Sequence, residues 1–262
     1  MIWRYCVLAI LLCAVSINAL ANSKANVRRF SPNEGLAQSY VTGLLVDKNG
    51  YLWVGTEAGV NRYDGYQLST MTGAEGQLRD KSIDFLYEDK QNDIWISTTY
   101  SGLYRYKTDT YQLERVLDFK NDRTHSPVVM LETHQPNFYW LGRVHDLALL
   151  NSETGEVKSV FKIPGDFKYA HVRALKYYKH FLIIGSSEGA YVMDTRTEKI
   201  VKLEVLNEPA AHHDQYNTKS FHISGSQLWL GTVQGLHTVE LDHIERLVAG
   251  EIDKLNSELR IS

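Results

Sequence analysis

The chain has 262 residues, of which 44% are apolar and 23% are charged, an ordinary balance for a globular protein that argues against disorder. Its net charge of -3 and isoelectric point near 6.4 argue against nucleic acid as a partner, because nucleic-acid-binding domains carry a clustered excess of Lys and Arg. With 16 tyrosines and only 5 prolines, the composition favours strands over helices.

The first 21 residues differ from the rest of the chain. Arg4 supplies a positive charge, Tyr5 to Ile17 form an almost unbroken apolar run, and Ala19-Leu20-Ala21 is a small-residue cleavage site. We predict a signal peptide over residues 1–21, and export to the periplasm. The alternatives are an uncleaved anchor, for which the run is short of the roughly 20 residues that span a membrane, and a lipoprotein modified at Cys13. Cys6 and Cys13 both lie in this segment, so the mature chain has no disulfide.

A four-residue pattern then recurs at intervals of 42, 45, 43 and 46 residues. Its copies are Trp53–Thr56, Trp95–Thr98, Trp140–Arg143, Ile183–Ser186 and Trp229–Thr232. Each copy follows an alternating apolar run and precedes a tight turn and further β segments, so each unit has four short strands. This layout is typical of a propeller blade. We therefore predict an all-β fold, a β-propeller of about five four-stranded blades, at roughly residues 39–72, 80–117, 126–162, 170–205 and 218–262.

The repeat also predicts how neighbouring blades pack. A large Trp fills the space between two blades, and a Gly two positions later lets a neighbouring backbone approach. The expected structural core of the repeat is Trp53, Gly55, Trp95, Trp140, Gly142, Gly185, Trp229 and Gly231. The turn after each of these strands uses a Gly in four units, and we expect Asp146 to take the left-handed position in the third.

The segment Gly43–Gly65 contains Asp47-Lys48-Asn49-Gly50-Tyr51-Leu52-Trp53-Val54-Gly55-Thr56 and Gly59-Val60-Asn61-Arg62-Tyr63. It resembles the two-component regulator propeller repeat, with the pattern D-x-x-G-x-L-W-x-G-T-x-x-G-L-x-x-Y. The third and fourth units depart from this pattern at Arg143, Asp146 and Ile183. The resemblance implies the periplasmic sensor part of a membrane signalling protein, whose output is a histidine kinase or a diguanylate cyclase.

In such relatives a β-sandwich, a transmembrane helix and the output domain follow the propeller. About seven blades at this repeat length need roughly 310 residues, so we expect an N-terminal fragment of an incomplete seven-bladed propeller. Val27 to Phe30 is a candidate closing strand. Leu241 to Gly250 has apolar residues at helical spacing and predicts one short helix, after which Lys254 to Ile261 would supply the last outer strand.

No catalytic constellation emerges from the sequence. Gly185 to Gly189 matches G-x-S-x-G, but the repeat places a hairpin there and a nucleophile elbow needs a strand-to-helix turn. His212-His213-Asp214 lacks a partner pair at metal-ligand spacing, so we expect no metal and no cofactor. Ligand-binding residues are expected on the face formed by the loops that enter each first strand and by the turns between second and third strands. The candidates there are Tyr40, Tyr100, Arg143, His145 and His171.

These patterns favour a ligand-sensing propeller of a signalling protein. The alternatives are a stand-alone secreted binding or scaffold propeller, and a propeller enzyme such as a lyase or glycan hydrolase. The expected partner is an unidentified small molecule or glycan. A membrane is expected only through C-terminal parts outside this chain, and homodimerisation only in a full-length parent.

Overall fold

The computed structural model describes residues 27–73, 78, 81–163, 171–203 and 217–252, together with the backbone of 258–261. The predicted signal peptide and the His212-His213-Asp214 segment lie outside these residues. The described part is mostly strand, and its 20 strands form five four-stranded antiparallel sheets. The predicted all-β propeller of about five blades is confirmed.

Each sheet is one blade, with its strands in chain order from the first to the fourth. Blade 1 contains β1 (Val41–Val46), β2 (Leu52–Thr56), β3 (Gly59–Tyr63) and β4 (Leu68–Met71). Blade 2 contains β5 (Ile83–Glu88), β6 (Ile94–Thr98), β7 (Gly102–Lys107) and β8 (Gln112–Asp118). Blade 3 contains β9 (Val129–Glu132), β10 (Phe138–Gly142), β11 (Asp146–Asn151) and β12 (Val157–Lys162).

Blade 4 contains β13 (Val172–Tyr178), β14 (Phe181–Ser186), β15 (Gly189–Asp194) and β16 (Ile200–Leu203). Blade 5 contains β17 (Thr218–Ser224), β18 (Gln227–Thr232), β19 (Gly235–Glu240) and β20 (Glu258–Ile261). Two 3-10 turns, η1 (Pro32–Glu34) and η2 (Arg123–His125), lie before blade 1 and between blades 2 and 3.

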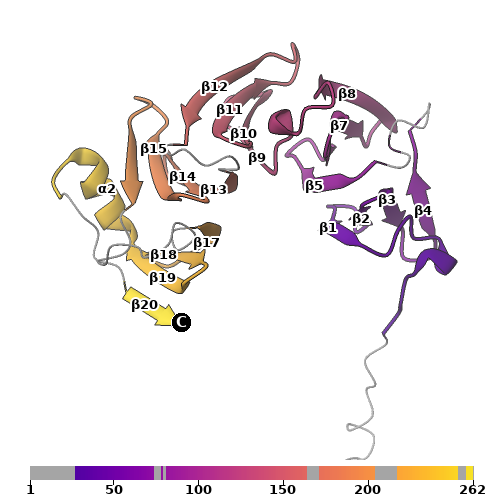
Figure 1. The fold of residues 1–262 in the computed structure, drawn as a ribbon, viewed down its shortest axis with the longest axis horizontal. Helices are drawn as coiled ribbons and strands as arrows, with labels where there is room; N and C mark the ends of the chain where they lie inside the picture. Colours follow the sequence, from indigo (N-terminus) through magenta and orange to yellow (C-terminus); the bar gives the residue numbers. More distant parts are fainter. Residues whose placement is uncertain are drawn as a thin grey trace, which may run out of the picture.

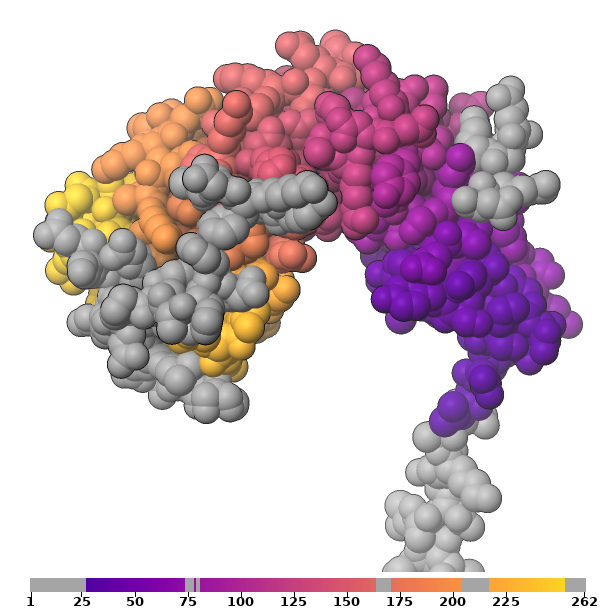
Figure 2. Space-filling model, viewed as in Figure 1, coloured from indigo at the N-terminus to yellow at the C-terminus, as the bar shows by residue number. Residues whose placement is uncertain are grey.

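The blades follow one another along an arc (Figure 1). Blade 1, in indigo, and blade 5, in yellow, lie at its two ends, and no strand pairing joins them among the described residues. Figure 2 shows the same arc in space-filling form, with the described atoms of its two ends on either side of an open space.

One face of each blade packs against the next blade. The Trp53 ring lies 5.3 Å from the Tyr106 ring of blade 2, and the Trp95 ring lies 4.8 Å from the Tyr139 ring of blade 3. Trp140 shares a buried cluster with blade 4, and Ile183 shares one with blade 5. The repeat therefore builds four successive interfaces with the same strand position at each centre.

The glycine of the pattern is where the next blade comes closest. A Cβ atom added to Gly55 would lie 2.9 Å from Ile83 Cγ2, and one added to Gly142 would lie 2.7 Å from Val172 Cγ1. At Gly185 the nearest atoms belong to Phe221 of blade 5, at 3.0 Å. These distances are shorter than ordinary contacts, so the first strand of the following blade excludes a side chain here.

The two ends of the arc expose faces that interior blades bury. Val41 and Ile83 occupy the same place beside a β-bulge in β1 and β5, yet Val41 is 42% exposed and Ile83 is fully buried. Leu44 and Val46, farther along β1, are 66% and 65% exposed. At the other end Trp229 is only partly buried, whereas Trp53 and Trp95 are fully buried.

A buried carboxylate anchors the tryptophan in the first two blades. Trp53 Nε1 donates to Asp47 Oδ2 at 2.8 Å, and Trp95 Nε1 donates to Asp89 Oδ2 at the same distance. The turn after each Asp also reaches the next blade, because the Lys48 amide donates to Glu88 Oε1 at 2.9 Å. The Lys90 amide makes the equivalent bond to Glu132 of blade 3, at 3.3 Å.

The single α-helix of the described part, α2 (Leu241–Ala249), interrupts the last blade between β19 and β20. Gly250 ends it with a φ of 81°, and its amide donates to the Arg246 and Leu247 carbonyls, so the predicted helix and its cap are confirmed. The predicted last outer strand is confirmed over Glu258–Ile261. The described helices include none long and apolar enough to cross a membrane.

Val27 to Phe30, the candidate closing strand, pairs with no blade in the described part, and blade 5 has its own outer strand in β20. These residues form no strand, and instead Phe30 stacks on Tyr63 with ring centroids 4.9 Å apart, while the Arg28 guanidinium lies 5.1 Å from the same ring. The chain then crosses blade 1, where the Ala37 amide donates to Asn61 Oδ1 at 2.7 Å. Side-chain contacts with blade 1 have replaced strand pairing in this segment.

Candidate functional site

The sequence places the candidate ligand residues on one face of the arc, and three of the five lie close together there. The turn between β10 and β11 carries Arg143 and His145, and His171 stands just before β13. Val144 and His171 form an isolated β-bridge, and the Val172 amide donates to the Arg143 carbonyl at 3.1 Å. The turn of blade 3 and the entry of blade 4 therefore lie side by side.

Arg143 is already engaged within its own turn. Its Nε donates to Asp146 Oδ1 at 2.8 Å and its Nη2 donates to Oδ2 at 2.6 Å, a bidentate pair with both side chains largely buried. The protein itself therefore supplies a carboxylate for this guanidinium. Arg143 thus fixes the turn that presents its neighbours.

The backbone of this turn differs from the prediction. His145 takes the positive φ, at 74°, and Asp146 begins strand β11. The expectation that Asp146 adopts the left-handed conformation is therefore wrong. From its extended position Asp146 accepts hydrogen bonds from Arg143 with both carboxylate oxygens. The left-handed residue of the turn is His145, one position before the predicted one.

His171 stands in a positively charged environment. Burial, followed by the charges of Arg173, Arg123 and His145, lowers the pKa of His171 to about 4, and the nearby Asp84 opposes this shift. Two buried nitrogens, His171 Nδ1 and Arg173 Nε, have no hydrogen-bond partner among the described residues. Buried polar atoms without partners are costly, so an acceptor group that reached Arg173 Nε would gain a hydrogen bond.

Asp84 belongs to a polar seam between blades 2 and 3 on the same face. Its two carboxylate oxygens accept hydrogen bonds from Thr99 Oγ1 at 2.8 Å and from Ser126 Oγ at 2.7 Å. Ser126 Oγ also lies 3.0 Å from the Thr98 carbonyl oxygen. The carboxylate is held by neutral partners, so it moderates the positive charge around His171 without removing it.

We use the name His171 cluster for His171, Arg173, Arg123, His145 and Asp84. The sequence pointed to two of its members, His145 and His171, and missed Arg173, Arg123 and Asp84. Arg173 is two residues after His171, so the sequence could have suggested it, whereas Arg123 and Asp84 approach His171 only through the stacking of blades 2 to 4.

The two tyrosines of the predicted site are exposed and stand on blades 1 and 2. Tyr40 lies directly before β1 and Tyr100 lies in the turn between β6 and β7. Both are solvent-accessible aromatic side chains, and no interaction between their rings and the His171 cluster is found in the described part of the chain.

The G-x-S-x-G segment lies in the hairpin between β14 and β15, as the repeat predicts. Ser187 Oγ accepts a hydrogen bond from the His171 backbone amide at 3.1 Å. The imidazole of His171 takes no part in that bond. Within the described ranges, no three His, Cys, Asp or Glu side chains are grouped to hold a metal ion. The face offers hydrogen-bond donors and positive charge for binding.

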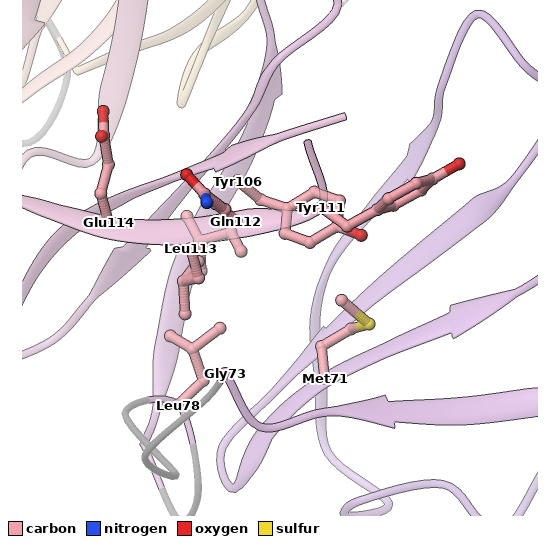
Figure 3. Close-up of a pocket in the computed structure, with 9 residues that line it drawn as sticks. Met71, Gly73, Leu78, Tyr106, Tyr111, Gln112, Leu113 and Glu114 are labelled. Atoms are coloured by element: carbon pink, nitrogen blue, oxygen red, sulfur yellow. The ribbon is translucent and has the colours of Figure 1, made fainter. Parts of the chain in front are cut away.

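Two recesses lie between blades 1 and 2, and the sequence did not indicate either. One has a volume of about 420 Å³ and is lined by apolar side chains that include Met71, Leu78 and Leu113. Figure 3 shows Tyr106 and Tyr111 on one side of it and Met71 and Leu78 on the other. The second, of about 400 Å³, shares Tyr106 and Tyr111 and is lined by polar groups that include Arg62 and Asp47.

Comparison with known proteins gives a match in the first two blades. Residues 35–58 and 77–100 match the model described as the two component regulator propeller. A 53-residue stretch is 45% identical to Histidine kinase P4 of Formosa agariphila, covering 20% of this chain and 4% of that protein.

Solved structures share the fold. The extracellular domain of the hybrid two component system BT3049 from B. thetaiotaomicron superposes with a TM-score of 0.64 at 18% identity, over 82% of this chain and 30% of that one. The corresponding domain of BT4673 gives 0.60 at 20% identity, over 76% and 27%. An inactive virginiamycin B lyase from Staphylococcus aureus gives 0.61 at 16% identity, over 83% and 72%.

The chain thus spans less than a third of the two solved extracellular domains named first. The predicted resemblance is confirmed by the family match in the first two blades, and the later blades repeat their strand order and packing. Two repeats of this chain match the two component regulator propeller model, and the described part folds as five successive blades of a β-propeller.

Proposed function

We propose that this chain is the periplasmic, ligand-binding propeller of a membrane signal-transduction protein whose output is a histidine kinase or a diguanylate cyclase. The observation that carries the proposal is the family match over residues 35–58 and 77–100, together with the 45% identity to a segment of a histidine kinase. In this view residues 1–21 direct export and residues 22–262 form the sensory propeller.

The His171 cluster is the proposed ligand site on this propeller. It stands on loops of a rigid scaffold, where binding residues concentrate, and it offers buried donors that lack partners among the described residues. The proposed ligand is a small molecule or a glycan fragment that carries hydrogen-bond acceptors. The proposed role is binding. Among the described residues, the hydroxyl of Ser187 contacts the backbone of His171 and not its imidazole, whose Nδ1 has no hydrogen-bond partner.

The proposal is tested by deleting the coding sequence in the producing bacterium and measuring phosphotransfer-dependent transcription and cyclic diguanylate. We expect one of these outputs to lose its response to a growth substrate, and to regain it when the wild-type sequence is restored. Restoration with Arg173→Ala should leave the response absent, because the variant removes a donor from the cluster. An unchanged output in the deletion strain would favour a stand-alone binding propeller.

A direct binding measurement separates the site from the pathway. The substrate that triggers the response should raise the melting temperature of the purified exported chain, and Arg173→Ala should abolish that rise. Lys176→Ala, three residues farther along the same strand, is the matched control and should leave the rise intact. If Arg173→Ala melts at a higher temperature with ligand, as the wild type does, the His171 cluster is not the site.

A further inference from the structure

The polar recess between blades 1 and 2 contains an arginine that lacks the partner found in the next blade. The recess lies where the turn between β1 and β2 meets the turn between β7 and β8. It is therefore at the opposite ends of the strands from the His171 cluster. Its walls include Arg62, Tyr51, Tyr106, Tyr111, Asp47 and Thr108.

The repeat provides an internal reference for Arg62. Arg62 and Arg105 occupy the same place, each paired across the sheet with the tryptophan of its blade. Each also lies over that tryptophan, with the guanidinium carbon 5.8 Å and 5.4 Å from the ring centroid. The two arginines are equivalent in backbone and in their aromatic neighbour.

Their charged partners differ. Arg105 Nε donates to Glu114 Oε1 at 2.6 Å, and Glu114 stands opposite Arg105 on β8. Opposite Arg62, on β4, the residue is Ser69. Among the described residues Arg62 forms no ion pair, so its positive charge faces the recess without the carboxylate that neutralises its counterpart.

Aromatic hydroxyl groups surround this charge. The Arg62 guanidinium lies over the Tyr51 ring, 4.8 Å from its centroid. Burial raises the pKa of Tyr106, and the positive charge of Arg62 opposes that rise, which places the Tyr106 hydroxyl beside the guanidinium. Tyr111 is exposed at the mouth and has a positive φ of 58°. The corresponding turns of blades 1, 3 and 4 also contain a residue with positive φ, at Gly65, Gly155 and Glu198, so this conformation belongs to the repeat.

The carboxylate of the recess is already used by the protein. Asp47 accepts from Trp53 Nε1 and from the amides of Asn49 and Tyr51, at 2.8 to 3.0 Å. These bonds hold it in the turn between β1 and β2. The recess still lacks an anionic acceptor for Arg62. A ligand that supplies one would also face the tyrosine hydroxyls and Thr108, which line the same recess.

We propose that this recess binds a small hydroxylated carboxylate, whose carboxylate takes on Arg62 the place that Glu114 takes on Arg105. A planar guanidinium recognises a carboxylate through two parallel hydrogen bonds. The tyrosine hydroxyls offer donors and acceptors to the ligand's own hydroxyl groups. The volume of about 400 Å³ lies within the range of small-molecule sites.

The experiment uses isothermal titration calorimetry of the purified exported chain with D-glucuronate. D-glucose, which has the same ring without the carboxylate, and succinate, which has carboxylates without hydroxyls, are the comparison probes. We expect glucuronate to bind and both comparison probes to bind at least about tenfold more weakly, the size of one lost charge-assisted hydrogen bond. Equal binding of glucose would overturn the role of the carboxylate, and equal binding of succinate would overturn the preference for hydroxyl groups.

Two substitutions at one position isolate the charge of the arginine. Ser69→Glu gives blade 1 the ion pair of blade 2 and should weaken glucuronate binding by about tenfold or more, while Arg62 remains in place. Ser69→Gln has nearly the same size and no charge, so it should bind as the wild type does. If both variants bind alike, or if the wild type does not bind glucuronate, the proposal is wrong.

Arg62→Ala should also abolish binding. If that variant fails to fold, the two Ser69 variants decide the question alone, because their side chains need not enter the core. The measurement does not depend on any signalling role of the chain, so its failure would leave the proposed function untouched.

Discussion

Blades 1 and 2 hold the centre of their interfaces differently from blades 3 and 4. In the first pair the tryptophan donates to an aspartate of its own blade, over 2.8 Å. In blade 3, Trp140 Nε1 donates to the Tyr177 hydroxyl of blade 4 at 2.7 Å, and in blade 4 the residue is Ile183, which has no polar group to satisfy. Strand order and packing position are the same in all four. The repeat thus keeps the large side chain in the same place. Its hydrogen-bond acceptor lies in the same blade in blades 1 and 2 and in the next blade in blade 3, and blade 4 needs none because Ile183 has no polar group.

The largest effect is expected from removing a fully buried tryptophan. Trp95→Ala should lower the free energy of unfolding by about 3 to 5 kcal/mol, because it leaves a cavity at the interface of blades 2 and 3. Trp229→Ala should cost less, since Trp229 is only partly buried at the end of the arc. Urea unfolding followed by fluorescence measures both. Equal losses would mean that the interior and terminal blades do not differ in packing.

The next effect concerns the carboxylate anchors. Asp89→Ala removes the acceptor of Trp95 Nε1, of the Tyr139 hydroxyl and of two backbone amides, and should cost about 3 kcal/mol or more. Asp47→Ala should cost less, because Asp47 has no tyrosine donor from the next blade. The comparison uses denaturant midpoints of the two variants. A greater loss for Asp47→Ala would contradict this order.

A smaller loss is expected from filling the closest approach between blades 3 and 4. A Cβ atom at Gly142 would lie 2.4 Å from Val129 Cγ1 and 2.7 Å from Val172 Cγ1, so Gly142→Ala should cost about 1 to 3 kcal/mol. Val172→Ala in the same chain should recover part of that loss by making room. A double variant no more stable than Gly142→Ala would show that the strain arises elsewhere.

The smallest effect is a pH dependence centred on blade 4. The folded state lowers the pKa of His171 to about 4, so between pH 6.5 and 4 the unfolded chain binds a proton that the folded chain does not. Stability should therefore fall as pH falls through this window, and His171→Asn should flatten the fall in melting temperature. His237, whose pKa is also lowered by burial, contributes in the same direction. A pH profile of His171→Asn identical to that of the wild type would contradict this expectation.

The sequence predicts most of the fold, because a blade is a local unit whose strands and turns follow one another in the chain. The phase of the tryptophans, the helix over Leu241–Ala249 and its glycine cap all follow from short-range patterns. The contact of Phe30 with Tyr63 depends on tertiary packing, so short-range patterns could not predict it.

The candidate sites are less predictable for the same reason. Asp146 lies three residues from Arg143, yet their bidentate pair depends on which residue of the turn takes the positive φ. The His171 cluster and the recess around Arg62 are built by neighbouring blades, and their members are 40 or more residues apart in several cases. Sequence reasoning placed His145 and His171 on the face where the structure has them, and it had no means of finding Arg62.

The residue at the end of β1 has a consequence for self-recognition. Glu88 and Glu132 each accept the turn amide of the preceding blade, but the same place in blade 1 is Val46. Were a second copy to stack its last blade on the first blade of this one, Val46 would offer no acceptor to the incoming turn. A copy stacked in this way would therefore lack the hydrogen bond that joins the turn of one blade to the next in the first three blades.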